Sequence, residues 1–301
     1  MTQTNLKKVF LLLPLTGIHG HMVKAQNEIK NSLKLIDIVV EVLDARIPIS
    51  SRNNLINELV KDKKRIIVLN KSDLADKIEL EKWEKYFEKN GNSCILTNAN
   101  KSENIIKIVN EIRNQGKAIY DEKYKNKSID IKPIYRVLIV GIPNVGKSTI
   151  INKIANKNVA IASNKPGVTK KNQWIRVGDD IELLDTPGLL MPRLDENDAG
   201  LKLALTGNIK PEILDNEELA CNGIKILLEQ GYSNLLKSQY KLDDSDFDME
   251  YYDILEKIGR KRGCLISGGN VDMSRAANIF LDDIKNGKIG LIILEKVGDV
   301  Q

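Results

Sequence analysis

Hydrophobic residues in the first two thirds of the chain form short runs that are rich in β-branched side chains. Six such runs have the pattern of strands, at residues 36–43, 65–69, 94–96, 136–140, 174–177 and 181–184. Between these runs, residues 78–88 and 102–116 have the spacing of helices. The lysine-rich residues 120–133 have the pattern of a surface linker. Residues 178–180 predict a hairpin turn. Apolar strands that alternate with helices are typical of a doubly wound, mainly parallel α/β sheet.

The pattern changes after about residue 205. Residues 216–229, 248–262 and 272–285 carry apolar side chains three and four positions apart, as helices do. Asp272 is a suitable N-cap for the last of these helices, and Gly287 is a suitable stop. We therefore expect an α/β domain over residues 1–205 and a small, mainly helical domain over residues 206–301.

Composition and charge narrow the class of protein. The chain has 301 residues and a formal charge of +5, yet residues 206–301 hold 12 Lys/Arg against 17 Asp/Glu. The positive excess of the first part suits a polyanion such as RNA, although a lysine-rich surface explains it equally. The 3 cysteines are widely spaced and the 2 histidines are too few for a metal centre. Because no apolar run approaches the roughly 20 residues of a membrane span, we expect a cytoplasmic protein without stable membrane association.

The most specific motif is GIPNVGKS at residues 141–148, which matches GxxxxGK[ST] between a predicted strand and a predicted helix. In such a loop the backbone N–H groups surround the phosphates, and the lysine reaches the β- and γ-phosphates. The serine hydroxyl binds Mg²⁺. The expected nucleotide contacts come from Pro143, Asn144, Val145, Gly146, Lys147, Ser148 and Thr149.

Two further segments have the spacing of a γ-phosphate sensor. Asp185, in DTPG at residues 185–188, closes a predicted strand and can hold Mg²⁺ through water. Gly188 can offer its N–H to the γ-phosphate. Thr169 lies between the two motifs, where a switch threonine completes the Mg²⁺ coordination.

Residues 70–73, NKSD, follow a predicted strand and indicate guanine recognition. The Asp73 carboxylate can accept from the N1–H and the 2-amino group of guanine, a pair of donors that adenine lacks. The stem of Lys71 can pack over the base, and Asn70 can tie this loop to the P-loop. Asn98 and Ala99 occupy the place of a backbone contact to guanine O6. The substrate and product are therefore expected to be GTP and GDP.

The order of these motifs is unusual. NKSD precedes the P-loop, which precedes DTPG, whereas ordinary small GTPases begin with the P-loop. The sequence therefore predicts a circularly permuted G domain, which is tolerable when the new termini fall in exposed loops. The chain after DTPG then runs directly into the helical domain. We hypothesise that the nucleotide state is read out as the position of residues 206–301.

Together with this order, several segments resemble the bacterial ribosome biogenesis GTPase A family over nearly the whole chain. They are GIPNVGKS, PGVTK, DTPGLL, GLKLALTGNI at residues 200–209 and KRGCLISGG at residues 261–269. The resemblance implies a GTPase that acts late in assembly of the large (50S) ribosomal subunit. It also implies that both domains contact the subunit precursor, through ribosomal RNA and ribosomal proteins.

Hydrolysis must use a group other than the usual glutamine after DxxG, because Leu189 occupies that place. A low intrinsic rate is therefore expected. The resemblance implies that His21, in GHMVKA, acts in hydrolysis, although Ile18 and His19 replace the Phe-Pro that is usual in the family. Lys147 and Thr169, from the motifs above, are the other expected catalytic residues. Asn144 stands where related GTPases use an asparagine to bind K⁺, a cation that can offset developing phosphate charge.

Basic side chains that could contact RNA occur in three groups. They are Lys257, Arg260, Lys261 and Arg262; Lys123, Lys125, Lys127 and Lys132; and Lys165, Lys170 and Lys171. The sequence leaves three hypotheses: a GTPase activated by ribosomal particles, an RNA-binding switch with negligible hydrolysis, and a GTPase of membrane or metal trafficking. The third hypothesis is not supported, because the sequence pattern shows neither a membrane anchor nor a metal cluster.

Overall fold

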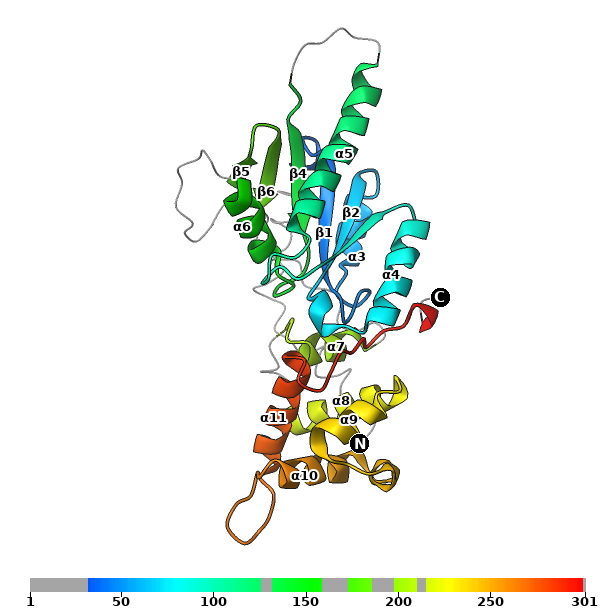
Figure 1. Cartoon of the computed structure of the whole chain (residues 1–301), viewed down its shortest axis with the longest axis vertical. Helices are drawn as coiled ribbons and strands as arrows, with labels where there is room; N and C mark the ends of the chain where they lie inside the picture. The colour runs from blue at the N-terminus through cyan, green and yellow to red at the C-terminus, as the bar shows by residue number, and fades with distance from the viewer. Residues whose placement is uncertain (1–31, 126–131, 159–172, 186–197, 210–214, 300–301) are drawn as a thin grey trace. The chain divides into compact units, whose positions relative to one another are not determined.

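The computed structural model describes the chain apart from residues 1–31, 126–131, 159–172, 186–197, 210–214 and 300–301 (Figure 1). The described residues divide into two compact units. The sheet unit comprises residues 32–73, 80–125, 132–158 and 173–185. In the described part of the chain, the helical unit comprises residues 74–79 and 198–299, which are two separate segments.

A six-stranded sheet forms the centre of the sheet unit. Its strands are β1 (Ile38–Asp44), β2 (Lys64–Asn70), β3 (Ser93–Thr97), β4 (Tyr135–Val140), β5 (Gln173–Val177) and β6 (Ile181–Asp185). Their spatial order is β3-β2-β1-β4-β6-β5, and every neighbouring pair is parallel except β5 with β6. The predicted mainly parallel α/β sheet and the hairpin between its last two strands are confirmed.

Helices pack on this sheet because its strands are apolar on both faces. The helices between the strands are α3 (Asn54–Leu59), α4 (Lys77–Lys89), α5 (Ile105–Tyr124) and α6 (Lys147–Asn158). Helix α5 packs against β1, β2, β3 and β4, and it crosses in front of the sheet in Figure 1. Helix α6 packs against β5 and β6. All seven residues of β1 are buried, as expected of a central parallel strand.

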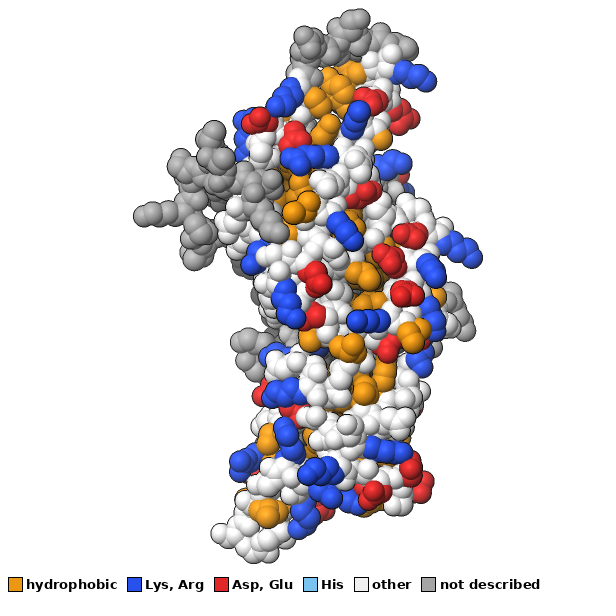
Figure 2. All heavy atoms as spheres, in the orientation of Figure 1, with side chains coloured by type: hydrophobic (Ala, Val, Ile, Leu, Met, Phe, Trp, Pro, Cys, Tyr) orange, Lys and Arg blue, Asp and Glu red, His pale blue; other side chains and the backbone are white. Residues whose placement is uncertain are grey.

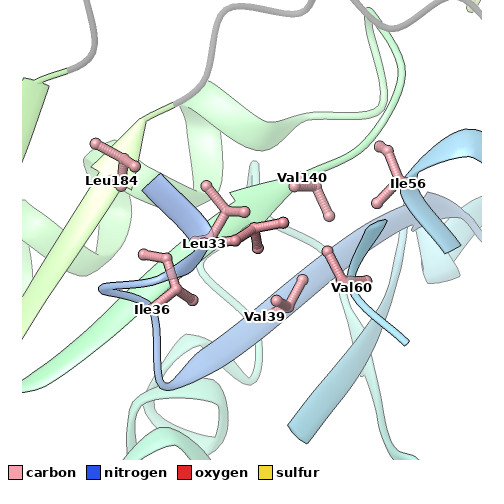
Figure 3. Packing of buried hydrophobic residues seen from close by; sticks show 8 residues of the cluster. Leu33, Ile36, Val39, Ile56, Val60, Val140 and Leu184 are labelled. Atoms are coloured by element: carbon pink, nitrogen blue, oxygen red, sulfur yellow. The ribbon is translucent and has the colours of Figure 1, made fainter. Parts of the chain in front are cut away.

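A cluster of buried aliphatic side chains joins three central strands to α3 and to the segment before β1 (Figure 3). Its members are Leu33, Ile36, Val39, Ile56, Val60, Leu138, Val140 and Leu184. Helix α3 has only six residues, too few to be stable by itself. Its packing into this cluster therefore determines that the segment is helical.

The strand register brings the predicted motifs to one edge of the sheet. Asp44 at the end of β1 pairs with Asn70 at the end of β2, and Asn70 pairs with Thr97 at the end of β3. On the other side of β1, Ile139 of β4 pairs with Asp185 at the end of β6. Ligands of open α/β sheets bind at this carboxyl edge, so the register supports a single site there.

The helical unit contains α7 (Ala199–Leu205), α8 (Asn216–Glu229), α9 (Ser233–Tyr240), α10 (Tyr251–Lys261) and α11 (Met273–Lys285). Helices α8, α10 and α11 pack against one another. The Asp272 carboxylate accepts from the backbone N–H of Arg275 at 2.9 Å, so it caps α11 as predicted. Gly287, with φ 70°, follows the end of α11 as predicted. No helix in the described part of the chain is long and apolar enough to cross a membrane.

The segment Leu74–Glu79 belongs to the helical unit although it directly follows NKSD in the chain. The backbone N–H of Ile292 donates to the Leu74 carbonyl at 3.1 Å. The Leu74 side chain also lies against Gly287, where an added Cβ would come within 2.8 Å of Leu74 Cδ2. Hydrogen bonding and side-chain packing therefore both hold this segment within the helical unit.

The structure differs from the expected organisation in two further places. Helix α7, which precedes the expected boundary at residue 206, belongs to the helical unit, because it packs against α8 and α11. The expected linker at residues 120–133 begins later, because α5 continues to Tyr124. The rings of Tyr120 and Tyr124, one helical turn apart, lie with their centroids 4.5 Å from each other. This contact supports the last turn of α5.

Candidate nucleotide-binding site

The predicted P-loop connects β4 to α6 through a turn that glycine makes possible. Gly146 has φ 104°, and a Cβ there would lie 2.2 Å from the Nδ2 atom of Asn70. A Cβ on Gly141 would lie 2.4 Å from the carbonyl oxygen of Val42. Asn144 also has a positive φ of 58°, which asparagine tolerates better than most residues. The loop therefore has the tight, backbone-exposing shape that phosphate binding requires.

The first turn of α6 carries the lysine and the serine of the P-loop motif. Lys147 is buried, and its Nζ donates to the carbonyl of Ile142 at 2.8 Å. This bond places the ammonium group over the loop. Ser148 is exposed at the same helix start. The positive end of the helix macrodipole adds to the lysine charge, so this corner of the sheet unit favours an anion.

The side chain of Asn70 links three of the predicted motifs. Its Nδ2 donates to the Val145 carbonyl in the P-loop at 2.7 Å. Its Oδ1 accepts from the backbone N–H of Ala99 at 3.0 Å. Asn70 is buried, so both hydrogen bonds are shielded from water. The predicted tie between the NKSD loop and the P-loop is therefore present in the structure.

In the NKSD loop, the Lys71 side chain is held by a buried carboxylate, whereas the Asp73 side chain is exposed. Lys71 has φ 61°, and its Nζ donates to Asp44 Oδ2 at 2.7 Å. Asp73 is exposed in the short 3₁₀ turn Ser72–Leu74. Sequence reasoning missed Asp44. The available signal was an acidic residue directly after the predicted strand at residues 36–43, just as NKSD directly follows the predicted strand at residues 65–69.

Asp44 is fully buried, yet its carboxyl is held in the ionised form. Burial alone would raise its pKa. The positive charges of Arg46 and Lys71, together with their hydrogen bonds, outweigh burial and hold the pKa well below its usual range. The Arg46 guanidinium is itself only 1% exposed and donates to both carboxylate oxygens. The end of β1 therefore presents a fixed negative charge to the NKSD loop.

The loop after β3 holds the two residues expected near guanine O6. Asn98 is buried, and its Oδ1 accepts from the backbone N–H of Lys101 at 3.2 Å. The N–H of Ala99, one of the two residues expected at the backbone contact to O6, donates to Asn70 Oδ1. The structure thus brings Ala99 to the NKSD loop. A contact from this N–H to a base would be shared with Asn70 or would replace that hydrogen bond.

Comparisons with known proteins agree with this geometry. Residues 136–251 match the sequence profile of a family described as 50S ribosome-binding GTPase. Ribosome biogenesis GTPase A of Bacillus licheniformis is 42% identical, and the match covers 93% of this chain and 98% of the relative. The chain belongs to the ribosome biogenesis GTPase A family.

Solved structures of the family have the same fold. A GDP-bound structure of YlqF matches with a TM-score of 0.64 and 29% identity, covering 90% of this chain and all of that chain. A GNP-bound structure of YlqF from T. maritima matches with a TM-score of 0.62 and 30% identity, covering 91% of this chain and 98% of that one. The chain is thus a circularly permuted P-loop GTPase, as its motif order predicts.

Three of the expected site residues lie outside the described part of the chain. They are His21, Thr169 and Gly188. The backbone of Asp185 closes β6 beside β4, which places this position at the same edge as the P-loop. Its side chain also lies outside the described atoms. The sheet thus brings together the P-loop, Asn70–Asp73 and Asn98–Ala99, and its register adds the backbone of Asp185.

Many of the basic residues suggested as RNA contacts pair with carboxylates. Arg260 pairs with Glu256 at 2.8 Å, Arg262 pairs with Asp283 at 3.0 Å, and Lys257 pairs with Asp246. Lys132 pairs with Asp179 at 3.1 Å. On the face shown in Figure 2, Lys and Arg side chains are interspersed with Asp and Glu rather than gathered in one patch. Lys127, Lys165, Lys170 and Lys171 lie outside the described residues.

Proposed function

We propose that this protein binds and hydrolyses GTP in a late step of large-subunit assembly. The observation that carries the GTP-binding part is the double hydrogen bond of Asn70, which joins the guanine motif to the P-loop and to Ala99. The ribosomal part is supported by the names of the relatives and by the matching 50S ribosome-binding GTPase profile. The proposed partners are the 50S precursor, its RNA and its proteins, in the cytoplasm.

Each motif has a distinct role in the proposed complex. Asp73 reads the guanine N1–H and 2-amino group, and the stem of Lys71 covers the base. Residues 143–149 surround the phosphates with backbone N–H groups, aided by the start of α6. Lys147 is buried near the phosphate end, where its charge is weakly screened. These roles divide the sheet edge into a base end on β2 and β3 and a phosphate end on β4.

The donor set suits Mg²⁺, which prefers a few hard oxygen ligands together with phosphate oxygens and water. The exposed Ser148 hydroxyl at the start of α6 is one such ligand. Asp185, whose backbone closes the neighbouring strand β6, is a second, and Thr169 is a third. When bound, Mg²⁺ would offset charge on the β- and γ-phosphates.

We propose that hydrolysis depends on His21 and Thr169 rather than on a glutamine. Leu189 follows DTPG and has no polar atom to orient water. We therefore propose a low intrinsic rate of GTP hydrolysis, because the residue after DTPG cannot orient the attacking water and such groups contribute strongly to this reaction. Asn144, exposed and with positive φ in the P-loop, is the proposed ligand for K⁺. The nucleotide state would then be read out through the helical unit.

A second candidate function is an RNA-binding switch that holds GTP with negligible hydrolysis. The observation that favours it is the leucine at the place of the usual glutamine. The two candidates differ in one measurable property, which is whether ribosomal particles accelerate turnover.

The deciding experiment measures GTP turnover in K⁺ buffer with and without purified 50S subunits. Strong stimulation that is lost in His21→Ala supports the assembly GTPase. His19→Ala is the matched control, because it removes a nearby histidine to which no role is given. Tight GTP binding without stimulation supports the switch instead, and absence of GTP binding overturns both candidates.

A further inference from the structure

We propose that Asp44 is a positioning residue for guanine recognition, and that it acts by holding the ammonium group of Lys71. This inference rests on the proposed function, in which the stem of Lys71 covers the base. Asp44 is not part of any of the nucleotide motifs. It lies at the end of β1, directly across from Asn70 in the strand register.

The Asp44 carboxylate is fixed by Arg46, and this leaves a defined position for Lys71. Oδ1 accepts from the backbone N–H of Arg46 at 3.1 Å and from Arg46 Nε at 3.0 Å. Oδ2 accepts from Arg46 Nη2 at 2.9 Å and from Lys71 Nζ at 2.7 Å. The Arg46 guanidinium thus donates to both oxygens of Asp44, and this bidentate contact restricts rotation of the carboxylate. The Lys71 ammonium group therefore meets a rigid acceptor.

Lys71 is fixed at both of its ends. At the backbone, its left-handed conformation (φ 61°) follows Asn70, whose carbonyl accepts from the Ala45 N–H at 2.8 Å. At the other end, Nζ is held by Asp44. The methylene stem must span the space between these two points, and the side chain remains 23% exposed. An apolar stem that is held in place and partly exposed is a suitable platform for a flat base, because less rotamer freedom is lost on binding.

The contact between Asp44 and Lys71 also determines where the positive charge of Lys71 lies in the site. Lys147 donates to Ile142 in the P-loop, whereas Lys71 donates to Asp44 on β1. The charge of Lys71 is therefore balanced on the base side of the site. Removing the Asp44 charge would leave Lys71 and the buried Arg46 as neighbouring cations that repel each other. We expect Lys71 then to leave its position, which weakens contact with the base.

The test compares two isosteric changes of buried acids on the same strand. Asp44→Asn removes the charge that holds Lys71. Glu41→Gln is the matched control, because Glu41 is equally buried on β1 and pairs with Arg52 at 3.1 Å and Arg65 at 3.2 Å, but with neither NKSD nor the P-loop. For each variant, the GDP dissociation constant, KM and kcat for GTP, and the midpoint of urea unfolding are measured.

We expect Asp44→Asn to raise the GDP dissociation constant and KM at least about tenfold while kcat at saturating GTP stays near the wild-type value. Lys71 contacts the base rather than the reacting phosphates, so binding is affected and chemistry is not. Glu41→Gln is expected to lower the urea midpoint without changing either constant. A merely structural role of Asp44 would instead lower kcat through loss of folded protein and leave the dissociation constant of the folded fraction unchanged.

A double-mutant cycle with Lys71→Met shows whether Asp44 acts through the lysine. If it does, Asp44→Asn adds little to the loss of GDP affinity in the Lys71→Met background. Additive losses overturn the proposal. If Asp44→Asn does not fold, Asp44→Glu keeps the charge but displaces it, and an unchanged KM in that variant overturns the proposal too. Wild-type protein that fails to bind GDP would instead overturn the proposed function.

Discussion

Gly146 and Asn70 fit together so closely that a Cβ atom on the glycine would lie 2.2 Å from the asparagine Nδ2. The two residues come from different motifs, since Gly146 lies in the P-loop that follows β4 and Asn70 is the last residue of β2. The phosphate loop and the guanine loop are therefore shaped by each other. A change in one of them is expected to alter binding at both ends of the nucleotide.

Gly146→Ala is expected to lower GDP affinity at least about tenfold, because the added methyl group displaces Asn70 and strains a backbone with φ 104°. Fluorescent GDP titration measures the effect. Gly91→Ala is the control, since Gly91 also has a positive φ of 78° but an added Cβ would meet nothing within 4 Å. We expect Gly91→Ala to lower stability slightly and to leave GDP affinity unchanged. Equal affinity losses in both variants would contradict the explanation.

Asp73→Asn is expected to change which base is bound. The carboxylate accepts from two donors of guanine, whereas an amide NH₂ would oppose the 2-amino group and could donate to the 2-oxo group of xanthine. We expect GDP affinity to fall by about a hundredfold or more and xanthosine diphosphate to become the better ligand. Competition between the two nucleotides measures this. Unchanged preference for GDP would remove Asp73 from the base site.

Asn144→Gly is expected to abolish stimulation by K⁺ while GDP binding persists. Glycine accepts the positive φ of 58° at this position, so the variant removes the amide without straining the loop. Turnover is measured with K⁺ and with Na⁺ at equal ionic strength. The wild type should be faster in K⁺ and the variant equal in both salts. A wild type that is indifferent to the cation would disprove the K⁺ site.

Lys261 and Arg262 are neighbours with different expected roles. Lys261 is exposed, whereas Arg262 donates to the buried carboxylate of Asp283, which also accepts from the hydroxyl of Tyr240 at 3.1 Å. Lys261→Ala should weaken binding to ribosomal RNA and reduce its salt dependence by about one phosphate contact. Arg262→Ala should instead destabilise the helical unit by about 2 kcal/mol. A reduced salt dependence in Arg262→Ala would make that residue an RNA contact as well.

Acid should weaken the fold partly through Asp44. Its pKa in the folded protein lies below the ordinary value of 3.8, so its contribution to stability is present above about pH 4. The contribution is lost as the pH falls further and the unfolded chain binds the proton first. Below pH 4, the free energy of unfolding of the wild type should fall more steeply than that of Asp44→Asn, by up to about 1.4 kcal/mol per pH unit. Parallel curves from urea unfolding would contradict this.

The strands were predictable because a buried parallel strand leaves a continuous apolar run that needs no knowledge of its neighbours. Residues 65–69 were expected, and β2 spans Lys64–Asn70. Helices α3, α7 and α9 were not predicted, since they have only six to eight residues and depend on packing with other elements. Leu74–Glu79 could not be assigned to the helical unit either, because its contacts lie at residues 287 and 292.

The nucleotide motifs were visible in the sequence because each is local and sits at the end of a predicted strand. The Asn70 side chain was expected to reach the P-loop, and it donates to Val145. Asp44 was missed because its partner Lys71 is 27 positions away and no local motif joins them. Single residues that act across strands require the register, which the sequence alone does not supply.

The described residues of the helical unit come from two distant segments of the chain, and this affects how the protein acquires its structure during synthesis. Leu74 leaves the ribosome long before Gly287 and Ile292, the residues that contact it in the finished unit. In a nascent chain, β1 and β2 can therefore pair early. The segment just after NKSD can form its contacts only when the last part of the protein has been synthesised. A fragment that starts at residue 193 would lack this piece and leave the N–H of Ile292 without its acceptor. The helical unit is thus a late product of translation rather than a detachable module.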